Sequence, residues 1–500
     1  MLEALLTVFS TLTEIPMILS ILGGAFAGII FGMIPGLNAL IAVPLFLPFL
    51  FGMNPYYGIA MLLSMGSVTQ TAGSVTSVLV GIPGCDQNIA SLEDCYALTK
   101  QGRAHEALGA ALVSSGLGGL LGGLVLLLLI PFMAPVLLYF ASPEQLMMVL
   151  VGVLFIALLS KDKIKGTIAG LLGLLFSLVG MSTITGQMRF TFGNINLMDG
   201  IRLVPVALGM FAIPELISMF FRKDDASATD ITFNRADISP KNVAKSGFRA
   251  VFQHPFLFLR SSLMGIFIGI IPAIGGAATS FLLYGFAKST AKNPELFGKG
   301  SIEGVVGPEA GNNAKDAGAL VPTLAFGIPG SLLMALYIGA FMVIGVTPGP
   351  SMFRDHMDVV MLLPIIIILA NLVAAAMLII ASTALIKLIY LRKGILPSVL
   401  LVTCTCGAFL IRQNWFDVLL FLGFGVLGYV SKKYDYNRSP FILGFVLGAL
   451  TERYLFVTMR VHGWAFLGRP IVMGILALII LYMIITQIKE RKKKRTAEPV

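Results

Sequence analysis

Long apolar runs separated by short polar loops recur along nearly the whole chain. A helix needs about 20 apolar residues to cross the hydrocarbon core of a bilayer. Clear runs of this kind lie at 15–33, 108–130, 145–160, 166–181, 203–221, 331–346, 361–389, 395–411, 416–430, 441–454 and 471–488. The pattern therefore predicts an all-α polytopic membrane protein with roughly 10–14 membrane segments.

Two helices in each half of the chain are predicted to be broken or re-entrant, because Gly and Pro interrupt them. The interruptions lie at 32–38 and 81–84 in the first half and at 269–276 and 327–330 in the second. The Gly-x-x-x-Gly-x-x-Pro sequence that begins at Gly28 recurs at Gly265, an offset of 237 residues (265 minus 28). The Gly-Ile-Pro-Gly sequence at Gly81 recurs at Gly327, an offset of 246 residues (327 minus 81). Two ordered matches at similar spacing indicate an internal duplication.

The positions of Lys and Arg predict that the two halves have opposite orientations. Basic residues gather in loops near 161–165, 222–223, 392–393 and 432–438 and in the tail at 489–495. Such loops stay on the cytoplasmic side of the membrane, which predicts a cytoplasmic C-terminus. Under this topology the span at 108–130 runs outward and the corresponding span at 361–389 runs inward. The halves are therefore predicted to be inverted-topology repeats.

The same pattern predicts the domain organisation. Residues 1–221 form a first membrane repeat, 222–254 a polar cytoplasmic connector, and 255–455 a second membrane repeat. Residues 456–500 form a final transmembrane helix and a basic cytoplasmic tail. The N-terminus lacks the features of a cleaved secretory signal, so we expect the first helix to be retained.

The composition agrees with a membrane protein and argues against several functions. Hydrophobic residues make up 57% of the chain and charged residues 12%, with a mean hydropathy of +0.91. The net charge of +10 comes from loops and the tail, so it indicates topology rather than nucleic-acid binding. The four Cys and four His residues show no ligand spacing, and we expect neither a disulfide framework nor a transition-metal site.

The breaks predict a binding cavity. In hydrocarbon an interrupted helix is tolerated only where it is buried in protein or lines a wet cavity. Freed amides at a half-helix N-terminus can bind a carboxylate, and freed carbonyls with side-chain oxygens can bind Na⁺. The predicted substrate-binding residues are Pro35, Gly36, Asn38, Ser77, Gly81, Gly84, Gly275, Gly276, Asn312, Gly327 and Gly330. The predicted cation-binding residues are Asn38, Thr76, Asn313 and Thr323.

Purely structural roles compete with this hypothesis. Small residues in membrane helices often allow close helix packing, and Pro often only kinks a helix. For Asn38 or Thr323 alone, an interhelical hydrogen bond fits as well as a ligand contact. The polar segment before Gly327 carries Lys315 and Asp316, which we expect to pair with other groups at the cavity mouth. Otherwise we expect the membrane region to be nearly free of ionisable residues.

Several motifs resemble those of a known family. The segment from Phe297 to Gly330, with Pro308-Glu309-Ala-Gly-Asn312-Asn313 and Gly327-Ile-Pro-Gly330, is similar to the signature of the large membrane subunit of tripartite tricarboxylate transporters, the TctA family. Shorter matches lie at 32–37, 189–201 and 424–429. Ser182 stands where the family pattern has an acid, and 84–87 also departs from it, which leaves the substrate open.

The resemblance implies the large subunit of an uptake system in a bacterial or archaeal cytoplasmic (inner) membrane. In that family the large subunit works with a small four-helix membrane subunit and an extracytoplasmic solute-binding protein. It also implies transport of an organic carboxylate driven by a cation gradient, with Na⁺ favoured over H⁺ as the coupling ion and no other cofactor.

We therefore expect a cation-coupled symporter for a tri- or dicarboxylate, and not an enzyme. Two alternatives stay open at this point. A membrane-embedded transferase would be expected to place acidic or His clusters at membrane depth, and a passive anion channel would not accumulate substrate. The residues do not decide between rocking and an elevator displacement, although paired re-entrant segments favour the elevator.

Overall fold

The computed structural model describes residues 2–34, 37–137, 139–158, 162–182, 184–221, 238–271, 275–384, 396–410 and 412–477. The helices of the first half are α1 (Leu2–Leu12), α2 (Ile15–Met33), α3 (Ala39–Phe46), α4 (Pro55–Val80), α5 (Leu92–Lys100), α6 (Ala104–Leu137), α7 (Ser142–Leu158), α8 (Lys163–Ser177) and α9 (Leu203–Phe221). Those of the second half are α10 (Pro240–Gln253), α11 (Pro255–Ile270), α12 (Gly276–Thr290), α13 (Glu303–Phe326), α14 (Leu332–Val343), α15 (Pro350–Asp355), α16 (Met357–Ile380), α18 (Leu396–Leu410), α19 (Trp415–Lys433) and α20 (Ser439–His462).

Short elements connect these helices. Five are 3-10 turns, namely η1 (Leu47–Gly52), η2 (Asp86–Ile89), η3 (Ile195–Leu197), η4 (Pro294–Leu296) and η5 (Gly463–Gly468). Strands β1 (Gly180–Met181) and β2 (Met188–Arg189) pair antiparallel after α8. The predicted span at 166–181 thus ends early. Ser182 and Arg189 both bond to Glu452 of α20, at 2.9 Å each, which fixes the hairpin against the helices.

The all-α membrane architecture is confirmed. Within the described ranges five helices are long and apolar enough to cross a membrane, or up to six if the bent pair α10 and α11 counts as one span. The five are α2, α6, α16, α19 and α20 together with η5. Shorter apolar helices, among them α3, α9 and α14, pack between them. The domain boundaries at 221, 254 and 455 stay predictions, as does the C-terminal tail, which lies outside the described residues.

The segment before Gly327 is polar in sequence but buried in the fold. The polar segment expected before Gly327 is a single helix, α13, and almost every one of its residues is buried. Its many Gly and Ala residues let neighbouring helices approach so closely that the polar side chains are covered by protein. Polarity in this segment therefore reflects buried side-chain contacts and not exposure to water.

Close glycine contacts give the duplication a structural basis. Helix α2 packs along α4, and α11 packs along α13. A Cβ on Gly28 would lie 2.5 Å from the carbonyl oxygen of Met65, and a Cβ on Gly265 would lie 2.2 Å from that of Gly311. These two contacts are related by the same offsets as the motifs, 237 residues on one helix and 246 on the other (311 minus 65). The two halves thus repeat the same helix pair in atomic detail.

Helices α4 and α13, which are equivalent in the repeat, cross each other antiparallel. Contacts between them join Gln70 to Asp316 and Ser74 to Glu309, so the partner number falls on α13 as the number rises on α4. Gln70 and Asp316 are themselves related by the 246-residue offset (316 minus 70). Two equivalent residues can touch only next to the pseudo-twofold axis that relates the halves. Because the equivalent helices α4 and α13 run antiparallel, this axis is perpendicular to them. For helices that run across the membrane, it lies in the membrane plane. The predicted inverted repeats are therefore present.

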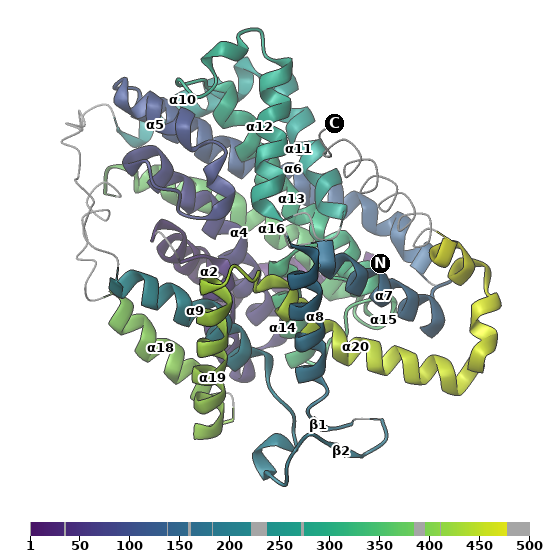
Figure 1. Cartoon of the computed structure of the whole chain (residues 1–500). Coiled ribbons are helices and arrows are strands. Elements are labelled where there is room, and N and C mark those ends of the chain that lie inside the picture. Colours follow the sequence, from purple (N-terminus) through teal and green to yellow (C-terminus); the bar gives the residue numbers. More distant parts are fainter. Residues whose placement is uncertain are drawn as a thin grey trace, which may run out of the picture.

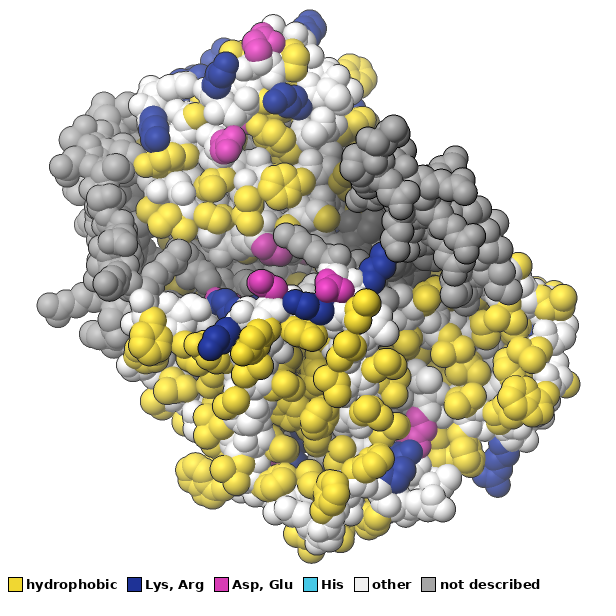
Figure 2. Space-filling view, in the orientation of Figure 1, with side chains coloured by type: hydrophobic (Ala, Val, Ile, Leu, Met, Phe, Trp, Pro, Cys, Tyr) yellow, Lys and Arg dark blue, Asp and Glu magenta, His cyan; other side chains and the backbone are white. Residues whose placement is uncertain are grey.

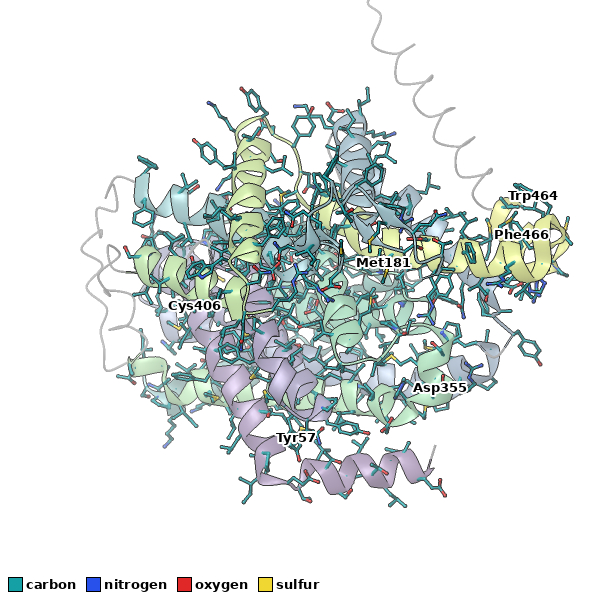
Figure 3. The ribbon with its side chains drawn as sticks, turned by 90° about the horizontal axis from the view of Figure 1, so that it is seen from below. Tyr57, Met181, Asp355, Cys406, Trp464 and Phe466 are labelled. Atoms are coloured by element: carbon teal, nitrogen blue, oxygen red, sulfur yellow. The ribbon has the colours of Figure 1, made fainter. Side chains whose placement is uncertain are left out.

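The outer helices follow the same symmetry. Helices α8 and α9 of the first half correspond to α19 and α20 of the second. Helix α8 packs along α20, and α9 packs along α19. The twofold relation between the halves converts each of these contacts into the other. Figure 1 shows α5, α10 and α12 at one end of the molecule and the β1–β2 hairpin at the other. Viewed from the hairpin end in Figure 3, Met181 lies near the middle and Trp464 and Phe466 lie at the outer edge.

The close approach of α2 to α4 and of α11 to α13 predicts the effect of a single methyl group. Gly28→Ala and Gly265→Ala should each destabilise the protein by about 1–3 kcal/mol, because the backbone carbonyl opposite the new Cβ has no room to move. Gly23→Ala is the control, since nothing lies within 4 Å of its Cβ position. Unfolding temperatures in detergent measure the effect. Equal unfolding temperatures for all three variants would contradict this account of helix packing.

Candidate functional site

A cavity of about 1130 Å³ lies where the helix breaks of both halves meet. Its wall includes the first residues of α3, α12 and α14, the middle of α4 and α13, and the start of α8. The loop between α19 and α20 closes another side. Figure 2 shows acidic and basic side chains gathered along a hollow across the middle of the molecule, between two largely apolar regions. The cavity is therefore polar and charged in an otherwise apolar protein.

Three helix N-termini contribute to this wall. The Asn38 side chain accepts a hydrogen bond from the Leu40 amide at 3.0 Å and caps α3, and Ser331 Oγ accepts one from the Met334 amide at 3.3 Å and caps α14. Gly275 precedes α12 and offers no side-chain cap. The first amides of a helix carry partial positive charge and bind anions. Their convergence makes one part of the cavity suited to a carboxylate.

A buried ion pair faces the same cavity. Lys315 Nζ lies 2.6 Å from Asp316 Oδ1, and these residues are only 2% and 4% exposed. Gln70 Nε2 donates a hydrogen bond to Asp316 Oδ2 at 2.7 Å. Lys315 also interacts electrostatically with Asp86, another residue of the wall. Lys315 and Asp316 therefore interact with other groups of the cavity wall, as predicted, and they also pair with each other.

The expectation of a membrane region nearly free of ionisable residues is wrong. Besides Lys315 and Asp316, α13 buries Glu309, which is 2% exposed. Its carboxylate accepts hydrogen bonds from Ser74 and Ser91 at 2.7 Å and from Ser115 at 3.1 Å. These hydroxyls come from α4, from the residue before α5, and from α6. The sequence signal for this buried acid is Pro308-Glu309 within a run of small residues.

The predicted substrate-binding residues fall into three groups. Asn38, Gly275 and Gly276 line the cavity. Pro35 and Gly36 lie outside the described residues. The remaining glycines hold the helix ends in shape: Gly81 and Gly327 end α4 and α13 in the left-handed conformation (φ of 72° and 68°), and Gly84 and Gly330 lie against Gly73 and Ala319. Ser77 and Asn312 are buried within α4 and α13. Their roles in binding stay predictions.

The predicted hydroxyl ligands bond to backbone. Thr76 and Ser77 both donate to the Gly73 carbonyl, at 2.9 and 3.2 Å, and Thr323 donates to the Ala319 carbonyl at 2.6 Å. Thr323 Oγ1 also accepts from the Gly330 amide at 3.2 Å. Each oxygen keeps a lone pair, so these contacts leave cation ligation a prediction. They show at least that the hydroxyls brace the backbone near each Gly-Ile-Pro-Gly sequence.

The two predicted Asn residues are buried on α13. Asn313 Nδ2 donates to Thr71 Oγ1 at 2.7 Å and to Asn371 Oδ1 at 2.6 Å, which joins α13 to α4 and α16. The side-chain oxygens of Asn312 and Asn313 find no hydrogen-bond partner in the described part of the chain. A buried carbonyl oxygen without a partner is costly. Neither residue lines the cavity, and their roles in substrate and cation binding stay predictions.

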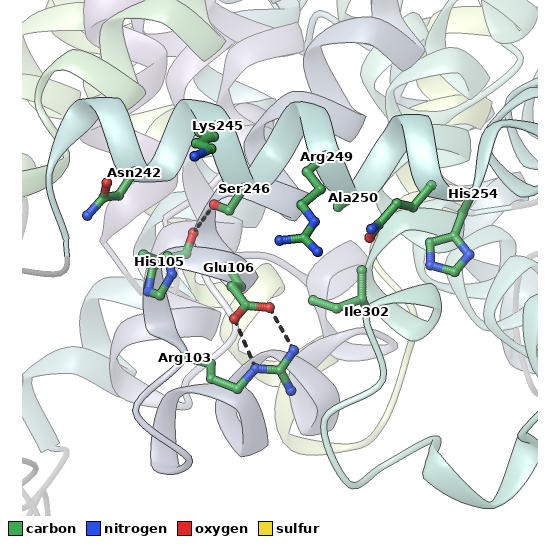
Figure 4. A pocket seen from close by; sticks show the side chains of 11 residues that line it. Arg103, His105, Glu106, Asn242, Lys245, Ser246, Arg249, Ala250, His254 and Ile302 are labelled. Carbon is green, nitrogen blue, oxygen red and sulfur yellow. Dashed lines mark hydrogen bonds and ion pairs between the residues drawn. The ribbon is translucent and has the colours of Figure 1, made fainter.

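A second pocket, of about 560 Å³, lies between α10 and the start of α6 (Figure 4). Arg103, Lys245, Arg249 and His254 give it a basic character, and Arg103 is paired with Glu106 at 2.6 Å. The bend between α10 and α11 at His254 lies at its edge, but none of the Gly-Pro breaks predicted from the sequence contributes to it. The described residues contain no group of three or more His, Cys, Asp or Glu that could hold a metal ion.

One family model and two curated relatives match the chain. The model of the tripartite tricarboxylate transporter TctA family matches residues 18–443. An Agrobacterium vitis protein described as an uncharacterized 52.8 kDa protein in the TAR-I ttuC' 3'region is 31% identical, over 94% of this chain and 93% of its own length. Another, from the TAR-II ttuC' 3'region, is 34% identical over 46% of this chain and 97% of its own length. No solved structure matches the chain.

The buried ion pair predicts a marked difference between single and double variants. Lys315→Met should destabilise the protein by about 3–5 kcal/mol, because it leaves Asp316 buried without its partner. Lys315→Met combined with Asp316→Asn should recover most of this loss. Thermal unfolding of both variants in detergent measures the difference. If the double variant were no more stable than the single one, the loss of stability in Lys315→Met would not come from leaving Asp316 without its partner.

Proposed function

The chain belongs to the tripartite tricarboxylate transporter TctA family, and on this premise we propose that it takes up an organic carboxylate by cation-coupled secondary transport. The substrate is a tri- or dicarboxylate delivered by an extracytoplasmic solute-binding protein. A small four-helix membrane subunit completes the complex in the cytoplasmic membrane. The protein performs no covalent chemistry on its substrate. The observation that carries the proposal is the charged cavity at the crossing of the repeats.

The cavity supplies what a carboxylate needs. Helix N-termini at Asn38, Gly275 and Ser331 provide amide donors and partial positive charge. Lys315 provides a full charge within the same wall. The volume of about 1130 Å³ leaves room for a small organic acid together with water. Binding by these groups explains why the breaks occur in both repeats, since each repeat contributes half-helix ends to one site.

Two buried oxygens on α13, in the turn before Lys315, support a cation site. Asn312 and Asn313 each keep a side-chain oxygen without a hydrogen-bond partner in the described residues. Hard cations such as Na⁺ are held by carbonyl and carboxylate oxygens, as half-helix sites in other transporters illustrate. Binding of a cation near an anionic substrate also offsets the cost of bringing negative charge into a low-dielectric protein. Na⁺ is the favoured coupling ion and H⁺ the alternative.

The symmetric core has an asymmetric environment, which supports an elevator displacement. Helices α3 and α14 contact each other, and α9 and α20 pack against them. In the repeat, α12 corresponds to α3 and η2 corresponds to α14. These two elements also contact each other. None of the described outer helices α7–α9 or α18–α20 packs comparably against α12 or η2. Sliding the core along the outer helices would exchange these two environments and expose the cavity to the opposite side.

Transport assays test the function directly. Purified protein with its small subunit and binding protein, reconstituted in liposomes, should accumulate labelled di- or tricarboxylate when a Na⁺ or H⁺ gradient is imposed. Empty liposomes and a dissipated gradient are the controls. Flux that never exceeds equilibrium would indicate a passive channel and overturn symport. Conversion of the substrate into a new compound would favour an enzyme.

The free oxygen of Asn313 predicts a change in cation affinity. Asn313→Ala should raise the Na⁺ concentration for half-maximal uptake by about tenfold, the loss expected for one good ligand interaction of about 1.4 kcal/mol. Asn293→Ala is the control, because Asn293 is exposed in a loop and caps no helix with its side chain. An unchanged Na⁺ requirement in Asn313→Ala, with normal expression, would remove Asn313 from the cation site.

A further inference from the structure

We propose that the Lys315–Asp316 ion pair couples substrate to cation by exchanging partners. A substrate carboxylate takes Lys315 from Asp316, and the Asp316 carboxylate then binds the coupling cation together with the side-chain oxygen of Gln70. No covalent bond changes in this step. The proposal rests on the proposed function, because it concerns the carboxylate site of that transporter.

The ion pair has the position that partner exchange requires. Lys315 and Asp316 both line the cavity that the helix N-termini of α3, α12 and α14 share. Their 2.6 Å contact neutralises both charges. A carboxylate that enters next to Lys315 competes directly with Asp316 for the ammonium group. Helix N-termini around the cavity stabilise the substrate in that position.

A second observation points to a cation at Asp316. Gln70 Nε2 donates to Asp316 Oδ2 at 2.7 Å, yet Gln70 Oε1 has no hydrogen-bond partner in the described chain. Gln70 is 3% exposed and also lines the cavity. Its unpartnered oxygen belongs to the same amide group that contacts Asp316, on a residue of the cavity wall. A carboxylate and an amide oxygen form an acceptable oxygen pair for Na⁺, and a proton on Asp316 would neutralise the same charge.

Charge balance makes the two binding events depend on each other. With its partner removed, Asp316 would be a buried carboxylate without compensation, which is strongly unfavourable. Asp86, another residue of the cavity wall, also interacts electrostatically with Lys315. Substrate therefore binds weakly to Lys315 unless a cation occupies Asp316, and a cation binds weakly at Asp316 while Lys315 stays paired with it. Each ligand lowers the cost of the other, which is the definition of positive coupling.

The repeat symmetry explains why this pair is well placed for alternating access. Gln70 and Asp316 occupy equivalent positions and meet beside the pseudo-twofold axis. A cation held between them would lie near this axis, at the same depth in the core whether the cavity opens to one side of the membrane or to the other. The position equivalent to Lys315 is Thr69 (315 minus 246), so only one half supplies the ammonium group. Glu309 is not a cavity residue, and its three serine hydroxyls already satisfy it.

The test measures substrate affinity as a function of cation concentration. Citrate and a panel of di- and tricarboxylates are bound to the purified protein in nanodiscs over a Na⁺ series at fixed pH and over a pH series without Na⁺. Wild-type affinity should rise by about tenfold or more across one of the two series, within the usual range of coupling between two sites. The series that produces the rise identifies the coupling ion.

Asp316→Asn should flatten this dependence to less than about twofold while substrate still binds, because Lys315 is then available without a cation. Gradient-driven accumulation should be lost, and exchange of internal for external substrate should remain. Asp355→Asn is the matched control, since Asp355 is exposed and pairs only with its neighbour Arg354 in the described structure. An Asp316→Asn protein that keeps the wild-type cation dependence would overturn the proposal.

Gln70→Met gives an independent test that leaves the ion pair intact. It removes the orphaned oxygen and should raise the cation concentration needed for half-maximal substrate binding by about tenfold if Na⁺ is the coupling ion. If the pH series identified H⁺, Gln70→Met should shift the midpoint of that series instead. No change in either series would overturn the role of Gln70. Failure of the wild-type protein to transport any carboxylate would instead refute the proposed function.

Discussion

Backbone that leaves a helix inside a membrane must find its hydrogen bonds within the protein, and the rest of this fold depends on how that need is met. The Gly84 amide donates to the Gly73 carbonyl at 3.3 Å, and the equivalent Gly330 amide donates to Thr323 Oγ1 at 3.2 Å. Each Gly-Ile-Pro-Gly loop is thus tied back to the helix it ends. Glycine at 73 and alanine at 319 let the loops come this close. Small residues on α4 and α13 are therefore required before any cavity can form.

Once the two loops are fixed, the antiparallel crossing of α4 and α13 determines what lies at the centre. Polar side chains of the two helices satisfy one another through Gln70 with Asp316, Ser74 with Glu309, and Thr71 with Asn313. Some polar atoms at this crossing are left without a hydrogen-bond partner. The side-chain oxygens of Gln70, Asn312 and Asn313 remain without partners in the described residues. In a protein interior such oxygens indicate places where a ligand completes the structure.

The sequence predicted the helix breaks, the duplication and the inverted topology, because glycine and proline spacing and loop charge act locally. It also predicted that Asn38, Gly275 and Gly276 would meet in a cavity, since breaks in hydrocarbon must lie together. It did not reveal that α13 is buried, because the neighbours that cover this polar helix lie far away in the chain. It also missed Gln70 and Glu309, because their partners lie about 200 residues away or more and no local pattern reveals such contacts.

The central claim is that substrate binds at the crossing of the two repeats, beside Lys315. Cryo-electron microscopy of the protein with a transported carboxylate and its coupling cation tests this claim most directly. The account predicts density between Lys315 and the first turns of α12 and α14. Substrate density in the basic pocket between α10 and α6, with an empty central cavity, would contradict it.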